Sequence, residues 1–428
     1  MSALQPIAIE VRIWGKRVGA VAADPSVAAH AFEYDVAWTR RGIKLAPLTM
    51  PITGERTFAF PGLDRDAFKG LPGLLADTLP DDFGNQLIDA WMASHGIDKR
   101  NVTTLDRLAY MGKRAMGALE FRPARGSARE SRQPLAMQHL VEEARRAIRA
   151  DLSDDEAAQA ALANIIRVGT SAGGARAKAV VAWNPQTNEL RSGQFDVDPG
   201  WEHWLLKFDG VGKDLELGSS QDYGRIEYAY HLMAMAAGID MSPCRLLQEH
   251  GRHHFMTRRF DREGNTKLHV QTLCALQHLN YRQRGTHAYE QLFMTAAQLG
   301  LPSAAMTQLF ARMAFNVMAR NHDDHTKNHA FMLREGGVWE LTPAYDVTFA
   351  YNPQGEWTQQ HLMSVNGKFD GIAKADLFNV AARFSVADAE KTIKQVRDAV
   401  REWRGFATQA GVQDAEIARI GGLQLSGV

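Results

Sequence analysis

The residues with the most specific chemistry lie in two short segments, NHDDHTKN at 321–328 and PAYD at 343–346. Asp323 precedes Asn328 by five positions, and Asp346 follows after a segment that predicts a hairpin. Protein kinases use an aspartate at the acceptor hydroxyl, an asparagine five positions later and a second aspartate that binds metal. Carboxylate and amide oxygens are the ligands that Mg²⁺ prefers. The residue types, their order and their spacing therefore predict phosphoryl transfer from a nucleotide.

The histidines of the same region favour a different chemistry. Three of them recur at helical spacing, namely His322, His325 and His329, and the first forms an HD dipeptide with the next residue. Clusters of His and Asp bind transition metals, so a metal phosphohydrolase of the HD type is an alternative. Such a site would need further histidines upstream, where the chain has His250, His253 and His254 beside several arginines. In the kinase interpretation, the histidines form hydrogen bonds within the loop and His325 orients it.

A glycine-rich segment lies far upstream, at 169–178 (GTSAGGARAK), and leads into an apolar segment at 179–183 that predicts a strand. Small residues let main-chain amides approach a phosphate, and Lys178 adds a positive charge. The spacing is not that of a Walker loop, which also opens a helix rather than a strand. By itself, the segment is more typical of a glycine turn between a helix and a strand.

Further parts of a nucleotide site follow in the order found in kinases. Residues 201–208 (WEHWLLKF) predict a strand with Lys207 near its end. A helix is expected from Arg225, with Glu227 in its first turn, where an acid either pairs with Lys207 or interacts with the helix dipole. The apolar face expected for this helix contains Tyr228, Leu232, Met235 and Ala236. Residues 255–261 predict a further strand, and the pieces together favour the kinase interpretation.

The remaining segments predict the framework that positions these residues. Short strands are expected within 7–60, and a helix is expected over 81–96. Residues 122–134 are rich in Arg, Ser, Gly and Pro, which is typical of a linker, although its arginines could form a basic patch. Two helical stretches follow, the second opening with a capping box at Ser153. An amphipathic helix is expected over 304–320, directly before the two aspartates.

The composition limits the class of protein. The 428 residues contain 49 basic and 49 acidic side chains, so the formal net charge is zero and gives no general attraction to nucleic acid. The length predicts two or three domains. Two cysteines, Cys244 and Cys274, exclude a disulfide framework and favour a reducing compartment. The N-terminus lacks the pattern of a secretory signal and no apolar stretch could span a membrane, so a soluble, cytoplasmic protein is expected.

Several segments together resemble the HipA family of bacterial toxin kinases. In the second part of the chain they are SAGGARAK (171–178), WLLKF (204–208), RRFDR (258–262), NHDDHTKNHAF (321–331) and LTPAYDV (341–347). The N-terminal part is similar to the same family through LPGLLADTLPDDFGNQLI (71–88) and RLAYMGKRAMGALEF (107–121). The resemblance covers nearly the whole chain, and the blocks that contain Asp323 and Asp346 are the most specific.

The resemblance implies an α+β protein with a two-lobed, protein-kinase-like fold. A small β-rich N-terminal subdomain, with strands followed by a helix, is expected over residues 1–125. A kinase N-lobe with the glycine-rich loop and the lysine strand is expected over 126–260. A helical C-lobe with the catalytic loop and the metal-binding aspartate is expected over 261–428.

The resemblance also implies roles for individual residues. Asp323 would be the catalytic aspartate, and Asn328 and Asp346 would hold Mg²⁺. Lys207 would contact the α- and β-phosphates of ATP, and Glu227 is a candidate partner for it. The other expected ATP-binding residues are Ser171, Ala172, Gly173, Gly174, Lys178, His325 and Lys327, together with Arg258, Arg259 and Phe260 in the adenine hinge.

Ser171 occupies the position of the serine that family members autophosphorylate, in a loop that covers ATP. A doubly charged phosphate there would not fit beside the phosphates of the nucleotide, so the kinase would inactivate itself. Thr170 is a neighbouring hydroxyl and stays an alternative for the modified residue.

The resemblance implies partners as well. Family members phosphorylate a component of translation, with an aminoacyl-tRNA synthetase as the known type of target. They are usually paired with a small helix-turn-helix antitoxin of the HipB type, so DNA would be contacted only through that antitoxin and a membrane not at all. A binding protein that acts mainly as a co-repressor with the antitoxin is the alternative. The intact set of Asp323, Asn328 and Asp346 favours an active kinase.

Overall fold

The computed structural model describes residues 8–24, 26, 28–80, 82–124, 177–209, 222–249 and 251–425. The chain divides into two units. The first unit contains Met1–Gly212, Asp261–Asn280 and Met332–Val338, and the second contains Lys213–Phe260, Tyr281–Phe331 and Trp339–Val428. Each unit therefore combines segments that are far apart in the sequence.

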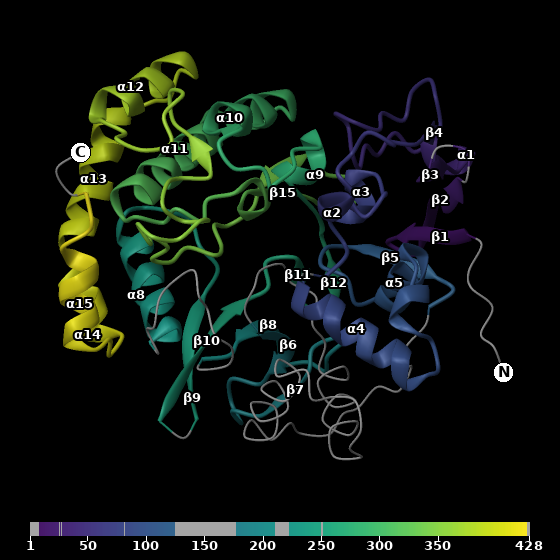
Figure 1. Cartoon of the computed structure of the whole chain (residues 1–428), viewed down its shortest axis with the longest axis horizontal. Helices are drawn as coiled ribbons and strands as arrows, with labels where there is room; N and C mark the ends of the chain where they lie inside the picture. Colours follow the sequence, from purple (N-terminus) through teal and green to yellow (C-terminus); the bar gives the residue numbers. More distant parts are fainter. Residues whose placement is uncertain are drawn as a thin grey trace. The chain divides into compact units, whose positions relative to one another are not determined.

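The first unit begins with an antiparallel sheet (Figure 1). Its strands are β1 (Ala8–Ile13), β2 (Lys16–Asp24), β3 (Ala29–Tyr34), β4 (Thr57–Phe58) and β5 (Leu119–Arg122), in the spatial order β4-β3-β2-β1-β5. Ile9, Val11 and Ile13 of β1 are fully buried, as expected for alternate residues of a strand with one face on the core. Trp14 and Gly15 both have a positive φ, which is the geometry of a two-residue hairpin turn. The short strands expected within 7–60 are thereby confirmed.

The first unit also contains helices, and some of them contact this sheet. They are α1 (Val36–Thr39), α2 (Arg65–Phe68), α3 (Gly73–Ala76), α4 (Asp82–Ser94), α5 (Thr104–Met111) and α9 (Leu273–Gln277). The helix expected over 81–96 is confirmed as α4. Thr103 and Asp106 form a capping box at the start of α5, which satisfies two main-chain amides and sets where the helix begins. The helix α5 then contacts β1 and β5.

A second set of strands in the first unit carries two lysines. β7 (Leu190–Ser192), β6 (Lys178–Trp183) and β8 (Glu202–Lys207) are neighbours in that order and antiparallel. Every residue of β6 is buried, including Lys178, and burial on both faces accounts for the apolar run at 179–183. The register pairs Lys178 with Lys207. The strands expected over 179–183 and 201–208 are confirmed.

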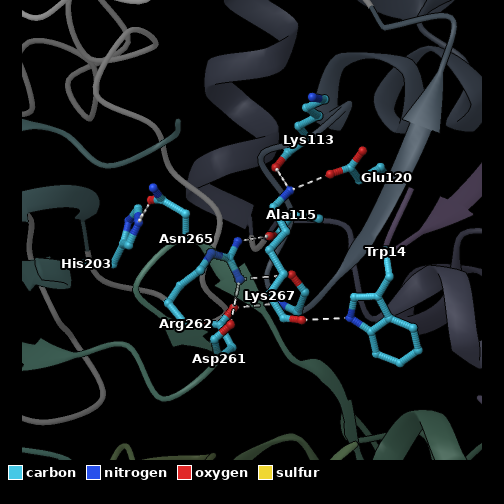
Figure 2. Close-up of polar contacts among 10 residues, drawn as sticks. Trp14, Lys113, Ala115, Glu120, His203, Asp261, Arg262, Asn265 and Lys267 are labelled. Carbon is cyan, nitrogen blue, oxygen red and sulfur yellow. Dashed lines mark hydrogen bonds and ion pairs between the residues drawn. The ribbon is translucent and has the colours of Figure 1, made fainter. Parts of the chain in front are cut away.

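Residues 261–272 belong to the first unit and form hydrogen bonds with residues of its N-terminal part. They form β11 (Arg262–Glu263), β12 (Thr266–Lys267) and β13 (His269–Thr272). Figure 2 shows Lys267 between two neighbours: its Nζ donates to the Lys113 carbonyl and to Glu120, each at 2.9 Å. The Trp14 indole donates to the Lys267 carbonyl at 2.8 Å. A segment some 250 positions downstream in the sequence thus completes the N-terminal part of this unit.

Asp261 and Arg262 form a buried ion pair in the same region (Figure 2), with 2.8 Å between Arg262 Nη1 and Asp261 Oδ2. The Gly117 amide donates to the same carboxylate at 2.7 Å. Arg262 donates to the carbonyls of Gly117 and Ala115, at 3.0 and 3.3 Å. Each charge is therefore surrounded by partners, which offsets the cost of its desolvation.

The second unit is mainly helical (Figure 1). Its helices are α8 (Tyr223–Ala236), α10 (Tyr289–Gln298), α11 (Ser303–Met318), α12 (Lys374–Arg383), α13 (Ala389–Arg401), α14 (Trp403–Gln409) and α15 (Asp414–Gly421). α11 contacts both α10 and α13, and its apolar residues Phe310 and Phe315 are fully buried. It confirms the helix expected over 304–320 and supplies the core of this unit.

The strands of the second unit are short. β9 (Cys244–Glu249) and β10 (Arg252–Arg258) form an antiparallel hairpin against α8, and β14 (His287–Ala288) pairs in parallel with β17 (Met363–Ser364). β15 (Ala330–Leu333), whose last residues belong to the first unit, and β16 (Trp339–Leu341) lie where the hairpin was predicted. The Thr342 amide and hydroxyl both donate to the Ala330 carbonyl, which closes that hairpin.

The apolar face predicted for α8 is wrong. Met235 is 51% exposed, Ala236 is exposed, and Tyr228 and Leu232 are only half-buried. The apolar side chains that α8 buries are those of Ile226, Ala229, Tyr230, Met233 and Ala234. The helix is apolar on several sides, and its neighbours β10, α13 and α14 decide which side is covered. Of the helices that the structure describes, none is both long and apolar enough to cross a membrane.

Candidate functional site

The aspartate loop, residues 321–328, begins where α11 has ended and lies wholly in the second unit. Two hydrogen bonds hold Asn321 to Asn316, one from amide to carbonyl at 3.0 Å and one between the side chains at 2.9 Å. The His322 amide donates to the Ala350 carbonyl at 3.0 Å. Only Thr326–Asn328 is helical, as a single 3-10 turn. The loop is therefore held by tertiary contacts and not by regular structure.

Asp324 anchors this loop, because its side chain is fully buried and surrounded by donors. Its Oδ2 accepts from the Tyr289 hydroxyl and from Nδ1 of His361, each at 2.8 Å, and its Oδ1 accepts from the Leu362 amide at 2.8 Å. Burial alone would raise the pKa of Asp324, but the charge on His361 and these hydrogen bonds together lower it below its ordinary value. The carboxylate is thus held in its charged form.

Asp323 is placed differently, with 38% of its side chain exposed. Its Oδ1 accepts from Trp357 Nε1 at 2.8 Å and lies 3.8 Å from Nε2 of His325. No described residue donates to Oδ2. Desolvation raises the pKa of the Asp323 carboxyl, and the carboxylates of Asp346 and Asp324 add to this effect. A carboxylate with a raised pKa and one accessible oxygen can accept a proton from a bound molecule.

The two predicted metal ligands line one pocket. Asn328 and Asp346 face it together with Asp324 and Asn321. Asn328 Nδ2 donates to the Asp323 carbonyl at 2.7 Å, which directs the amide nitrogen toward the loop and leaves Oδ1 for another partner. Asp346 has a φ of 52°, a left-handed conformation that is uncommon outside glycine and is typical of functional sites.

These residues fit a hard cation. The side-chain oxygens of Asn328 and Asp346 share the pocket, and Oδ1 of Asn321, which also lines it, is buried without a partner among the described residues. Magnesium is commonly bound by one or two such protein oxygens plus substrate phosphates and water. The donor set is therefore suited to Mg²⁺ and not to a metal that requires several histidines.

Phe260, one of the residues predicted for an adenine hinge, is linked to the aspartate loop through Tyr345. The Phe260 ring lies 5.6 Å from the Tyr345 ring, and the Tyr345 hydroxyl donates to the Lys327 carbonyl at 2.7 Å. Arg259 is buried, while Arg258 at the end of β10 is exposed. The second unit therefore brings Phe260, the aspartate loop and the segment that contains Tyr345 together, although Phe260 lies far from the other two in the sequence.

Not every predicted residue can be placed beside Asp323. Ser171, Ala172, Gly173, Gly174 and the alternative Thr170 lie outside the described residues, as do most of 122–134 and the segments for which two helices were predicted. Lys178 is buried in β6 and Lys207 ends β8, both in the first unit. Glu227 is buried in α8 of the second unit, so its pairing with Lys207 stays a prediction.

The histidines of the alternative metal site have separate environments. His322 packs 4.0 Å from the His361 ring, and burial lowers the pKa of His322 to about 2. His329 packs against Tyr289, and burial lowers its pKa to about 4. Within the part of the chain that the structure describes, no three His, Cys, Asp or Glu side chains are grouped to hold a metal. Nothing in these residues supports the HD phosphohydrolase.

Three functional neighbours were not predicted from the sequence: the anchor Asp324, its donor Tyr289, and Trp357. A polar residue inside the apolar α11, Asn316, was a sequence signal for a buried polar partner. The structure shows that partner to be Tyr289, whose hydroxyl accepts from Asn316 Nδ2 at 2.8 Å. Trp357 gave no signal, because nothing in its local sequence distinguishes an indole that binds a carboxylate from one that packs in a core.

The β-rich N-terminal region and the helical C-terminal part define an α+β protein with a two-lobed, kinase-like fold. A family model described as "HipA-like C-terminal domain" matches residues 170–403, and one described as "HipA N-terminal domain" matches residues 9–122. The chain therefore belongs to the HipA family. The expected fold class and the family resemblance are both confirmed.

Two individual relatives are similar to this chain either at low sequence identity or over a short segment. A chain of the complex of toxin–antitoxin system HipA, HipB and operator DNA from Shewanella oneidensis is 17% identical, with a TM-score of 0.64 over 97% of this chain and 94% of that one. At this identity the likeness concerns the fold alone. A curated relative, the serine/threonine-protein kinase toxin HipA of Shewanella oneidensis, is 31% identical over 83 residues, so the match spans 19% of either protein.

Proposed function

We propose that this chain is a serine/threonine protein kinase of the HipA toxin type that uses ATP and Mg²⁺. One observation carries the proposal: Asp323 keeps an accessible oxygen beside a pocket that Asn328 and Asp346 line. The residues on both sides of Asp323 in the loop are buried, so the carboxylate is presented by a fixed backbone. This is the arrangement that phosphoryl transfer to a hydroxyl requires.

In the proposed reaction, Asp323 accepts the proton of a serine or threonine hydroxyl of the protein substrate. The hydroxyl oxygen bonds to the γ-phosphorus of ATP while the bond from that phosphorus to the β,γ-bridging oxygen breaks, and ADP leaves. The raised pKa makes Asp323 a stronger proton acceptor than an ordinary exposed aspartate. Mg²⁺, held by Asn328 and Asp346, would neutralise charge on the phosphates.

Roles in nucleotide binding are proposed for the residues that the family resemblance names. Lys207, with Glu227 as its candidate partner, would contact the α- and β-phosphates, and Phe260 would contact adenine. Further contacts are proposed for Ser171, Ala172, Gly173, Gly174, Lys178, Arg258, Arg259, His325 and Lys327. In this scheme residues 126–260 and 261–428 form the two kinase lobes after an N-terminal subdomain of residues 1–125. Family membership supports these roles.

Regulation and partners follow from the same family. We propose that Ser171, or the neighbouring Thr170, is autophosphorylated and that the modified loop no longer accepts ATP. The related complex from Shewanella oneidensis contains HipB and operator DNA, which supports a HipB-type antitoxin as partner and DNA contact through it. The proposed substrate is a translation component, with an aminoacyl-tRNA synthetase as the first candidate.

Mass spectrometry of phosphatase-treated protein after incubation with Mg-ATP tests the kinase. Wild-type protein should gain one phosphoryl group on the peptide that contains Ser171, and Asp323→Asn should lower the labelling rate about a thousandfold, since it removes the proton acceptor. Asp370→Asn is the matched control, because Asp370 is an aspartate of the same unit whose side chain is 70% exposed, and it should label normally. Labelling of Asp323→Asn at the control rate would contradict the assignment.

Ser171→Ala separates self-labelling from activity. This variant should not label itself but should still transfer phosphate to an added aminoacyl-tRNA synthetase. A label on a different peptide of the wild type would refute the loop assignment. If the wild type gains no mass at all, the alternative of a binding protein that acts with an antitoxin would replace the kinase, and a gel shift with operator DNA and antitoxin would test it.

A further inference from the structure

Among the residues that the structure describes, Trp357 is the only one that donates to the carboxylate of Asp323. It lies in the segment between Asp346 and β17, outside the NHDDHTKN and PAYD motifs. The bond joins Trp357 Nε1 to Asp323 Oδ1 over 2.8 Å. An indole N–H can only donate, so it has no competing role as an acceptor at this position.

The segment that carries Trp357 is itself bound to the neighbouring aspartate. Four and five positions after the tryptophan, His361 Nδ1 and the Leu362 amide donate to Asp324, each at 2.8 Å. One short segment, residues 357–362, therefore contacts both Asp323 and Asp324, the two adjacent aspartates that form the DD pair. The donor side chain is thus attached to the same buried anchor that fixes the backbone of Asp323.

The residues directly before and after Trp357 also have contacts of their own. Its neighbour Glu356 pairs with Arg284 at 2.7 Å, and the His325 ring lies 6.3 Å from the indole. The next residue, Thr358, is buried and its carbonyl accepts from the Asn352 amide. With contacts before and after it, the indole keeps one orientation while only half-buried.

The geometry has a chemical consequence for the proposed kinase. A carboxylate has two oxygens that exchange by rotation about one bond, and only one of them can face the acceptor hydroxyl productively. A donor fixed on Oδ1 stops this rotation and leaves Oδ2 toward the substrate. We propose that Trp357 is a positioning residue that orients the Asp323 carboxylate so that Oδ2 receives the proton, an inference that rests on the proposed kinase activity.

Trp357→Phe tests this role, because it keeps the aromatic ring and removes the N–H. Its kcat for phosphoryl transfer should fall about tenfold while the KM for ATP changes less than twofold, since the lost bond acts on Asp323 and not on the nucleotide. Trp14→Phe is the matched control: Trp14 is also half-buried, also donates one 2.8 Å bond, and lies in the first unit. It should keep both constants.

A spectroscopic measurement tests the bond without relying on activity. In protein labelled with ¹⁵N-tryptophan, the indole resonance that disappears in Trp357→Phe should shift in Asp323→Ala, which removes both carboxylate oxygens. The Trp14 resonance should not move. An unshifted Trp357 resonance would refute the contact, whatever the variants do to the rate.

The outcomes separate the two proposals. A wild type that transfers no phosphoryl group refutes the kinase and, with it, the positioning role. An active wild type with an equally active or faster Trp357→Phe variant refutes only the role of Trp357, and a faster variant would show that the indole obstructs Asp323. A loss confined to kcat, together with the shifted resonance, supports the proposal.

Discussion

Asp261 of the first unit and Asp323 of the second are both aspartates on loops, yet their surroundings differ. The Asp261 side chain is fully buried, and it accepts from Arg262 and the Gly117 amide. Asp323 is 38% exposed and has one oxygen bonded, to Trp357. A carboxylate whose oxygens are surrounded by donors stabilises the fold, and one that keeps an accessible oxygen can take part in chemistry.

The same contrast occurs inside the DD pair. Asp324 resembles Asp261, because it is fully buried and accepts three hydrogen bonds that hold its charge. Asp323 has the raised pKa and Asp324 the lowered one, although the two residues are adjacent. Burial and partners, rather than residue type, therefore assign the structural and the chemical role.

The largest expected effect on stability comes from Asp261→Asn. It would leave the Arg262 guanidinium buried without a countercharge, so the free energy of unfolding should fall by about 3 kcal/mol. Urea unfolding followed by tryptophan fluorescence measures it. Glu263→Gln is the control, because Glu263 forms an exposed pair with Arg334 in the same unit and should change stability by less than about 0.5 kcal/mol. Equal losses in the two variants would contradict a special role for the buried pair.

Asp324→Asn should have the next largest effect. The amide nitrogen would face either the Leu362 amide or both the Tyr289 hydroxyl and His361 Nδ1, so at least one buried hydrogen bond would be lost, at a cost of about 2 kcal/mol. Thermal unfolding should show this loss, and the labelling rate with Mg-ATP should also decrease because the aspartate loop is no longer anchored. Unchanged stability would show that the anchor is not needed.

Buried histidines extend the comparison to both units. Burial lowers the pKa of His269 and His278 in the first unit, and of His329 in the second, to about 4. The unfolded chain binds protons near pH 6.5 and the folded protein does not, so stability is complete above 6.5 and decreases as the pH falls toward 4. Each histidine should cost on the order of 1–2 kcal/mol by pH 5. Urea midpoints measured from pH 7.5 to 5 should decrease steadily, and a constant midpoint would contradict the prediction.

Asp323→Asn should have the smallest effect on the free energy of unfolding, and any change should stabilise the fold rather than destabilise it. Because the fold raises the pKa of this carboxyl, it disfavours the charge, and a neutral amide should leave the free energy of unfolding unchanged or raise it by up to about 1 kcal/mol. The same variant removes the proposed activity. Paired unfolding curves with Asp324→Asn test it, and equal destabilisation by the two substitutions would remove the distinction between them.

Much of the framework could be predicted because it depends on local patterns. The helix α11, the strands β6 and β8 and the N-terminal hairpin have periodicity or turn residues that act within a few positions. The buried face of α8 could not be predicted, since this helix carries apolar residues on several sides and its packing partners lie elsewhere in the chain. The contact of the Lys267 carbonyl with Trp14 had no local signal either.

The sequence by itself determined which residue types could do chemistry and in what order, because the spacing of Asp323, Asn328 and Asp346 is a property of the chain. Only the tertiary structure decided which aspartate of the pair is buried and which is open. That choice depends on donors from other elements, Tyr289, Trp357 and His361, which lie 34 to 37 positions away from the aspartates they contact. Desolvation and hydrogen bonding from distant segments set protonation and orientation, and no local pattern records them.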